Sequence, residues 1–143
     1  MAPGLLYAAC KPEPAHAAVI LIVRIFAASK TAIQAESLTA PLIAAMRTLG
    51  PRWSGVAAQG LPECYWKLPE LYEHNLQLDS AGLEHVRLLV AMLPGAWTPA
   101  RIEDALLQTD EDEDLSMVWC RTPGSVFLLP EVQWVEVRLM HAR

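Results

Sequence analysis

The sequence has little charge, few glycines and few cysteines. Charged residues make up 19% of the chain and hydrophobic residues 53%, whereas globular domains usually have about 25% charged residues. This excess of apolar residues excludes intrinsic disorder for the chain as a whole. The seven glycines form neither a GxGxxG nor a GxxxxGKS/T pattern, so no phosphate-binding loop is predicted.

Metal and cofactor signatures are also missing. The three cysteines are far apart and odd in number, which excludes a disulfide framework. Two Glu-His pairs stand eleven residues apart, too far along a helix to hold one metal ion, and neither forms an HExxH pattern. The run of five acidic residues at positions 110–114 lacks the Gly and Glu spacing of a calcium-binding loop. We therefore predict no metal site and no cofactor.

No apolar run is long enough to cross a membrane. The longest run covers residues 17–28 and contains Arg24, whereas a spanning helix needs roughly 20 apolar residues. The first residues lack the basic and apolar regions of a signal peptide. We therefore expect a cytoplasmic protein with no membrane partner. The net charge of −5 also argues against a nucleic-acid partner, because such binding depends on basic side chains.

Hydrophobic periodicity predicts a β-rich start, a helical middle and a β-rich end. The apolar run over residues 17–26 lacks alternation of apolar and polar residues, which predicts a strand buried on both faces. Pro41 either begins a new helix near Thr39 or lies within a longer one. The expected strands are residues 4–10, 17–26, 115–121, 126–129 and 132–140, with one or two short strands within 53–68. The expected helices are residues 29–49, 80–93 and 98–107, with a helical turn or two within 69–78 and a strand over 86–92 as an alternative.

Together these elements predict an α+β fold in a single compact domain, residues 1–143. Its mostly antiparallel sheet would combine an N-terminal strand pair with a C-terminal β-meander, and two to four helices would pack on one side. Residues 122–125, Thr-Pro-Gly-Ser, fit a type II turn. In the last strand, alternation places Trp134 with Glu136 and Arg138 on the outward face. Exposed sheet edges could pair with a second copy, so a homodimer stays open.

Negative charge is concentrated in the second half of the chain. Residues 1–62 contain five basic and two acidic residues, whereas residues 63–143 contain six basic and fourteen acidic ones. Five acids are consecutive at residues 110–114, and such neighbours repel each other unless positive charge neutralises them. A basic protein partner would neutralise them and would be steered to the site. A solvated acidic loop is the alternative.

We therefore expect a non-enzymatic protein-binding domain with a basic protein partner. Its most concrete form is an acidic inhibitor or immunity-type protein that neutralises a cationic bacterial toxin or nuclease. Eight Arg against three Lys, with 21 Ala, is a bias typical of GC-rich bacterial genomes. Tryptophan is enriched at binding hot spots, so we include two tryptophans with the acids among the expected partner-binding residues. The expected partner-binding residues are Trp97, Glu103, Asp104, Asp110, Glu111, Asp112, Glu113, Asp114 and Trp134.

Two other functions stay open. A small enzyme or ligand-binding domain would use a pocket containing Cys64, Glu73 and His74, because a thiol beside an imidazole can act as a nucleophile. No GxSxG or papain-like pattern accompanies these residues. A self-associating structural subunit would bury its surplus apolar surface against copies of itself.

Overall fold

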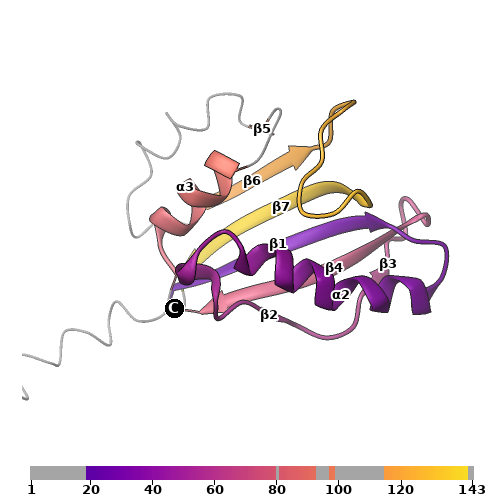
Figure 1. The fold of residues 1–143 in the computed structure, drawn as a ribbon, viewed down its shortest axis with the longest axis horizontal. Coiled ribbons are helices and arrows are strands. Elements are labelled where there is room, and N and C mark those ends of the chain that lie inside the picture. Colours follow the sequence, from indigo (N-terminus) through magenta and orange to yellow (C-terminus); the bar gives the residue numbers. More distant parts are fainter. Residues whose placement is uncertain (1–18, 80, 93–96, 99–114, 142–143) are drawn as a thin grey trace, which may run out of the picture.

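The computed structural model describes residues 19–79, 81–92, 97–98 and 115–141, and it shows one antiparallel sheet with helices on one face (Figure 1). The strands are β1 (Val19–Ala28), β2 (Ala57–Ala58), β3 (Glu63–Cys64), β4 (Leu71–Asp79), β5 (Trp97–Thr98), β6 (Leu115–Cys120) and β7 (Val132–His141). The helices within the described ranges are α2 (Ala32–Arg47) and α3 (Leu83–Met92), with a 3₁₀ turn at Pro51–Trp53. The predicted α+β class is confirmed. The strand predicted at residues 4–10 and the helix predicted beyond Thr98 lie outside the described residues.

The long strand β1 lies at the centre of the sheet. The strand order is β2-β4-β1-β7-β6-β5, and β3 also pairs with β4. All of these pairs are antiparallel. Both described neighbours of β1 come from later in the chain, so the fold depends on contacts between segments far apart in sequence.

Alternation along β1 divides its side chains between two faces of the sheet. Leu21, Val23 and Ile25 are almost fully buried on the face covered by the helices, which we call the inner face. Ile22 and Arg24 point to the other side, the outer face, and are half-buried. The predicted burial of this strand on both faces is therefore correct for the inner face and too strong for the outer one. The helices add Leu42, Met46, Val86 and Leu89 to the core.

Helix α2 is continuous through Pro41. Its N-cap is Thr31, whose Oγ1 accepts a hydrogen bond from the backbone N–H of Gln34 at 3.1 Å. This cap satisfies one of the N–H groups that a helix start leaves free. The alternative of a longer helix is therefore confirmed, and a new start near Thr39 is wrong.

The helical turns predicted within residues 69–78 are wrong, because this segment forms β4. Its buried side chains include His74, Leu76 and Leu78, at every second position, while Asn75 and Gln77 between them are more exposed. A period of two is typical of a strand. The alternative of a strand over residues 86–92 is also wrong, since these residues belong to α3.

The strand predicted at residues 126–129 is wrong as well. This segment is a loop between β6 and β7, with a single isolated bridge between Phe127 and Leu129. Leu128 has φ of 63°, a left-handed conformation that interrupts any strand. The C-terminal β-meander is therefore reduced to the hairpin of β6 and β7, with the short strand β5 at the edge.

The type II turn predicted at the start of this loop is confirmed. The backbone N–H of Ser125 donates to the carbonyl oxygen of Thr122 at 3.0 Å, and Gly124 has φ of 81°. A type II turn needs a positive φ at this third position, which favours glycine.

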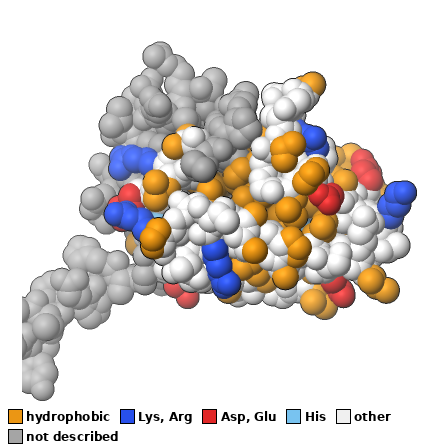
Figure 2. Space-filling model, in the orientation of Figure 1, with side chains coloured by type: hydrophobic (Ala, Val, Ile, Leu, Met, Phe, Trp, Pro, Cys, Tyr) orange, Lys and Arg blue, Asp and Glu red, His pale blue; other side chains and the backbone are white. Residues whose placement is uncertain are grey.

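Basic and acidic side chains are interspersed on the helix-bearing side of the molecule (Figure 2). Apolar side chains reach the surface between them. Of the helices that the structure describes, none combines the length and the apolar character needed to cross a membrane.

We predict that Gly124→Ala lowers the free energy of unfolding by about 1 kcal/mol, because an L-residue is disfavoured at this φ. A Cβ there would meet nothing within 4 Å, so the loss would report backbone strain alone. The matched control is Gly55→Ala, whose Cβ would lie at an ordinary 3.6 Å from Leu78 Cδ1. Urea denaturation should show a loss for the first variant and none for the second; equal midpoints would contradict the turn assignment.

Candidate functional site

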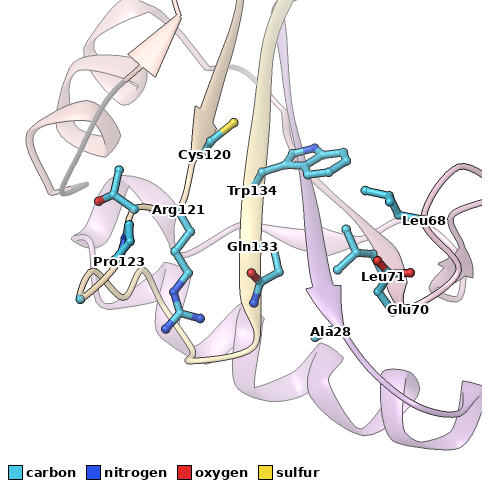
Figure 3. A pocket seen from close by; sticks show the side chains of 11 residues that line it. Ala28, Leu68, Glu70, Leu71, Cys120, Arg121, Pro123, Gln133 and Trp134 are labelled. Atoms are coloured by element: carbon cyan, nitrogen blue, oxygen red, sulfur yellow. The ribbon is translucent and has the colours of Figure 1, made fainter.

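The outer face carries charged and aromatic residues across its central strands. The antiparallel register places Arg24 of β1 directly opposite Glu136 of β7. The next outer-face residue of β1, Phe26, lies between Glu73 of β4 and Trp134 of β7. Figure 3 views this face, with the helices behind the strands. The outer face is therefore the part of the described surface where chemistry-bearing side chains gather.

Arg24 is the charged centre of the outer face. Its Nε–H donates to Glu73 Oε1, and its Nη1 donates to Glu136 Oε2 at 2.9 Å. Glu136 also accepts a hydrogen bond from Arg138 Nε at 2.8 Å. The side chains of Arg24, Glu73 and Glu136 are 25%, 16% and 15% exposed, so water only partly screens the network. The hydrogen bond to Glu73 and the charges of both carboxylates raise the pKa of Arg24, although burial acts in the opposite direction.

Three aromatic rings pack together next to this network. The Phe26 ring lies 4.4 Å from the Trp134 ring and 5.1 Å from the Tyr65 ring, measured between centroids. Tyr65 comes from the loop before β4 and contacts Trp134 edge-on at 5.6 Å. Phe26 is only 2% exposed, so this loop shields one end of the outer face.

A β-bulge changes the direction of the side chains at the start of β7. Phe26 lies opposite Trp134, but the next residue of β1, Ala27, lies opposite Val132, which leaves Gln133 without a partner on β1. Neighbouring residues of a regular strand point to opposite faces. Here Gln133 and Trp134 line the same pocket on the outer face, as a bulge allows.

This bulge pocket is an open depression with a volume of about 640 Å³, and its lining residues are shown in Figure 3. Leu68 and Glu70 form the wall next to β4. Cys120 and Arg121 form the opposite wall at the end of β6, and Trp134 lies between the two walls. The remaining lining residues are Ala28, Leu71, Thr122, Pro123, Gly124 and Gln133.

The two walls of the bulge pocket carry opposite charges. The Arg121 side chain donates from Nε to the Ser125 carbonyl at 2.9 Å and from Nη1 to the Pro130 carbonyl at 2.5 Å. These bonds fix the guanidinium and leave its other N–H groups without a partner among the described residues. The Glu70 carboxylate likewise has no hydrogen bond or ion pair with any residue that the structure describes. Both charged groups are therefore available to a ligand.

A smaller hollow of about 280 Å³ lies farther along the outer face. Its polar lining consists mainly of amides and guanidinium groups, but the two arginines are already paired with carboxylates. The lining residues are Ile22, Arg24, Gln59, Asn75, Gln77 and Arg138.

All seven predicted partner-binding acids belong to residues 99–114, outside the described part of the chain. They are Glu103, Asp104, Asp110, Glu111, Asp112, Glu113 and Asp114. The strands on both sides of this acidic segment, residues 99–114, are described. Trp97 of β5 lies opposite Trp119 of β6, and Thr98 opposite Val118. The acidic segment is therefore connected at both ends to the β5–β6 edge of the sheet.

Trp134 lies on the predicted face of β7, together with Glu136 and Arg138. It is half-buried, because it packs against Phe26 and Tyr65. Of Trp97, only the pairing of its backbone with β6 is described.

The residues of the alternative catalytic pocket do not converge. Glu73 and His74 are neighbours on β4, so Glu73 points to the outer face and His74 to the inner face. Cys64 is exposed in β3, and its thiol donates to the Pro69 carbonyl at 3.3 Å. Among residues 19–79, 81–92, 97–98 and 115–141, no three His, Cys, Asp or Glu side chains lie close enough to share a metal ion.

His74 is instead a buried residue of the helix–sheet interface. It is 2% exposed, and its Nδ1 lies 3.3 Å from Thr39 Oγ1 of α2. No described residue bonds to its Nε2. Burial disfavours the charged imidazolium and lowers the pKa of His74, which favours the neutral form in the folded state.

The bulge pocket was not predicted, although β7 carries a signal for it. The inward-facing apolar residues Val135, Val137 and Leu139 are spaced by two, whereas Val132 precedes Val135 by three. Both Val132 and Val135 are fully buried. A change of spacing between two buried positions of one strand indicates a bulge.

We predict that Arg24→Met lowers the free energy of unfolding by about 2 kcal/mol, because two shielded carboxylates lose their cation. The matched control is Arg52→Met: Arg52 pairs with Glu84 at 3.0 Å, but the two side chains are 53% and 60% exposed. That change should cost less than about 0.5 kcal/mol. Chemical denaturation measures both, and equal losses would contradict the structural role of the Arg24 network.

We also predict that acidification destabilises the fold through His74. The pKa of His74 is lowered from its usual 6.5 in the folded state, so below that pH the unfolded chain binds more protons and stability falls. His74→Leu should remove this part of the pH dependence between pH 7 and about 5.5, where histidines titrate and most carboxylates stay ionised. Denaturation midpoints measured across this window test it. An unchanged slope in the variant would contradict the assignment.

Comparison of the chain with protein-family models, curated proteins and solved structures found no match.

Proposed function

We propose that this protein is a non-enzymatic protein-binding domain whose partner is a cationic protein. The observation that carries the proposal is the separation of charge between the described fold and the rest of the chain. The described residues contain eight basic and eight acidic side chains. The net charge of −5 therefore belongs entirely to the remaining residues.

The acidic segment accounts for this surplus. It contains seven acids and one arginine, and both of its ends join the β5–β6 edge of the sheet. Negative charge concentrated in one segment next to a neutral body attracts a basic partner and accelerates their encounter.

The arrangement of the described titratable groups supports a binding role over an enzymatic one. The charges of Arg24, Glu73, Glu136 and Arg138 neutralise one another. His74 faces the core, away from Glu73. The Cys64, Glu73 and His74 pocket would need these side chains to meet.

The more specific form of the proposal is an inhibitor of immunity type. A cationic toxin or nuclease has a basic surface that attracts its anionic substrate, and an acidic protein of this size can cover that surface. Inhibition then follows from occlusion and needs no catalytic group in the inhibitor. In this form of the proposal the protein itself is cytoplasmic and its partner is a bacterial toxin or nuclease.

We predict that neutralising the acids of the acidic segment abolishes capture of the partner. The test variant is D110N/E111Q/D112N/E113Q/D114N, and the matched control is E36Q/E63Q/E70Q/D79N/E84Q, which removes five exposed acids of the described fold. Both variants have the same net charge. Pull-downs from the source cells, followed by mass spectrometry, should recover a protein with a pI above about 9 with the wild type and the control but not with the test variant.

Recovery should also fall at high salt, because screening weakens exposed charge pairs. An acidic partner, or equal recovery with both variants, would contradict the proposal. Co-expression then tests the inhibitor form: the wild type should relieve toxicity of the captured protein, and the test variant should not.

A further inference from the structure

The bulge pocket combines opposite charges with an apolar middle. Arg121 lies on one wall and Glu70 on the other together with Leu68, while Trp134 provides apolar surface between the walls (Figure 3). The Arg121 guanidinium is held by the Ser125 and Pro130 carbonyls. Such a site suits a ligand that carries a positive group, an apolar body and a negative group in that order.

The site is built by the fold and does not arise from one loop. It requires the register shift that places Gln133 beside Trp134, since a regular strand would turn one of them into the core. The backbone N–H of Arg121 donates to the Gln133 carbonyl at 2.9 Å, which ties the bulge to the charged wall. Bulges that redirect side chains are common next to binding sites.

We propose that the bulge pocket binds a short free peptide of dipeptide size, a zwitterion with apolar side chains. Its ammonium group pairs with Glu70, its carboxylate pairs with the free N–H groups of Arg121, and an apolar side chain packs on Trp134. This inference is independent of the cationic partner proposed above, because it uses neither the acidic segment nor the β5–β6 edge.

The need for two charges selects the class of ligand. The terminal groups of an extended dipeptide are about 7 Å apart, and the pocket volume of about 640 Å³ accommodates such a molecule with its side chains. One terminus of a folded protein would supply only one of the two charges. A free amino acid carries both charges on one carbon atom, whereas Glu70 beside β4 and Arg121 after β6 are separated by β1 and β7, three strand spacings or about 14 Å between backbones.

The probe is leucyl-leucine, added at millimolar concentration to the full-length, ¹⁵N-labelled protein. The readout is the indole N–H signal of Trp134 in NMR spectra, which Trp134→Phe assigns. N-acetyl-leucyl-leucine lacks the ammonium group, leucyl-leucine amide lacks the carboxylate, and free leucine tests the size requirement. The Trp134 signal should shift with leucyl-leucine, and affinity for each capped peptide and for leucine should be about five-fold lower, as expected for a lost exposed ion pair.

The variant Glu70→Gln separates a ligand contact from a structural effect. The backbone carbonyl of Glu70 accepts a hydrogen bond from the Ser29 N–H at 3.1 Å, and a change of the side chain leaves this bond in place. Glu70→Gln should lower the affinity for leucyl-leucine about five-fold and leave the affinity for N-acetyl-leucyl-leucine unchanged. The matched control, Glu36→Gln on the exposed side of α2, should change neither.

Three results would overturn the inference. They are an unchanged Trp134 indole signal with leucyl-leucine, equal affinity for free and capped peptides, or an equal effect of Glu70→Gln on the affinities for leucyl-leucine and N-acetyl-leucyl-leucine. The wild-type pull-down outcome is unaffected by any of them, so failure here is distinguishable from failure of the proposed function.

Discussion

The pairing of β1 with both β4 and β7 is the interaction on which the rest of the structure depends. On the inner face it aligns the apolar side chains that α2 and α3 cover. On the outer face the same register places Arg24 between two carboxylates and Phe26 beside Trp134. The single shift in that register, at Gln133, opens the bulge pocket. Core, charge network and pocket are therefore consequences of one set of strand pairs.

The parts of the fold that could be predicted are those with strong local periodicity. The helices α2 and α3 and the strands β1, β6 and β7 all lie close to where the hydrophobic pattern placed them. The strand β4 was missed because its alternation is short and follows a segment rich in proline and aromatic residues, and its pairing with β1 stabilises it. Residues 126–129 were misassigned because an apolar run does not reveal the left-handed conformation of Leu128.

The candidate site was predictable only in part. Alternation alone placed Trp134 on the outer face, and charge alone identified the acidic segment. The bulge pocket brings together side chains of residues 68–71, 120–124 and 133–134, and no local pattern reports which distant segments meet. Conversely, residues that are adjacent in sequence need not belong to one site. Glu73 and His74 are neighbours on β4, yet the strand places them on opposite faces of the sheet.

The molecule combines a neutral α+β body with one strongly acidic segment attached at the β5–β6 edge. We propose that this segment steers a cationic partner to the fold. The most direct test is the association rate constant with the captured partner as a function of ionic strength. We predict that the rate constant falls steeply with added salt while the dissociation rate changes little. An association rate constant that does not depend on salt would contradict the claim.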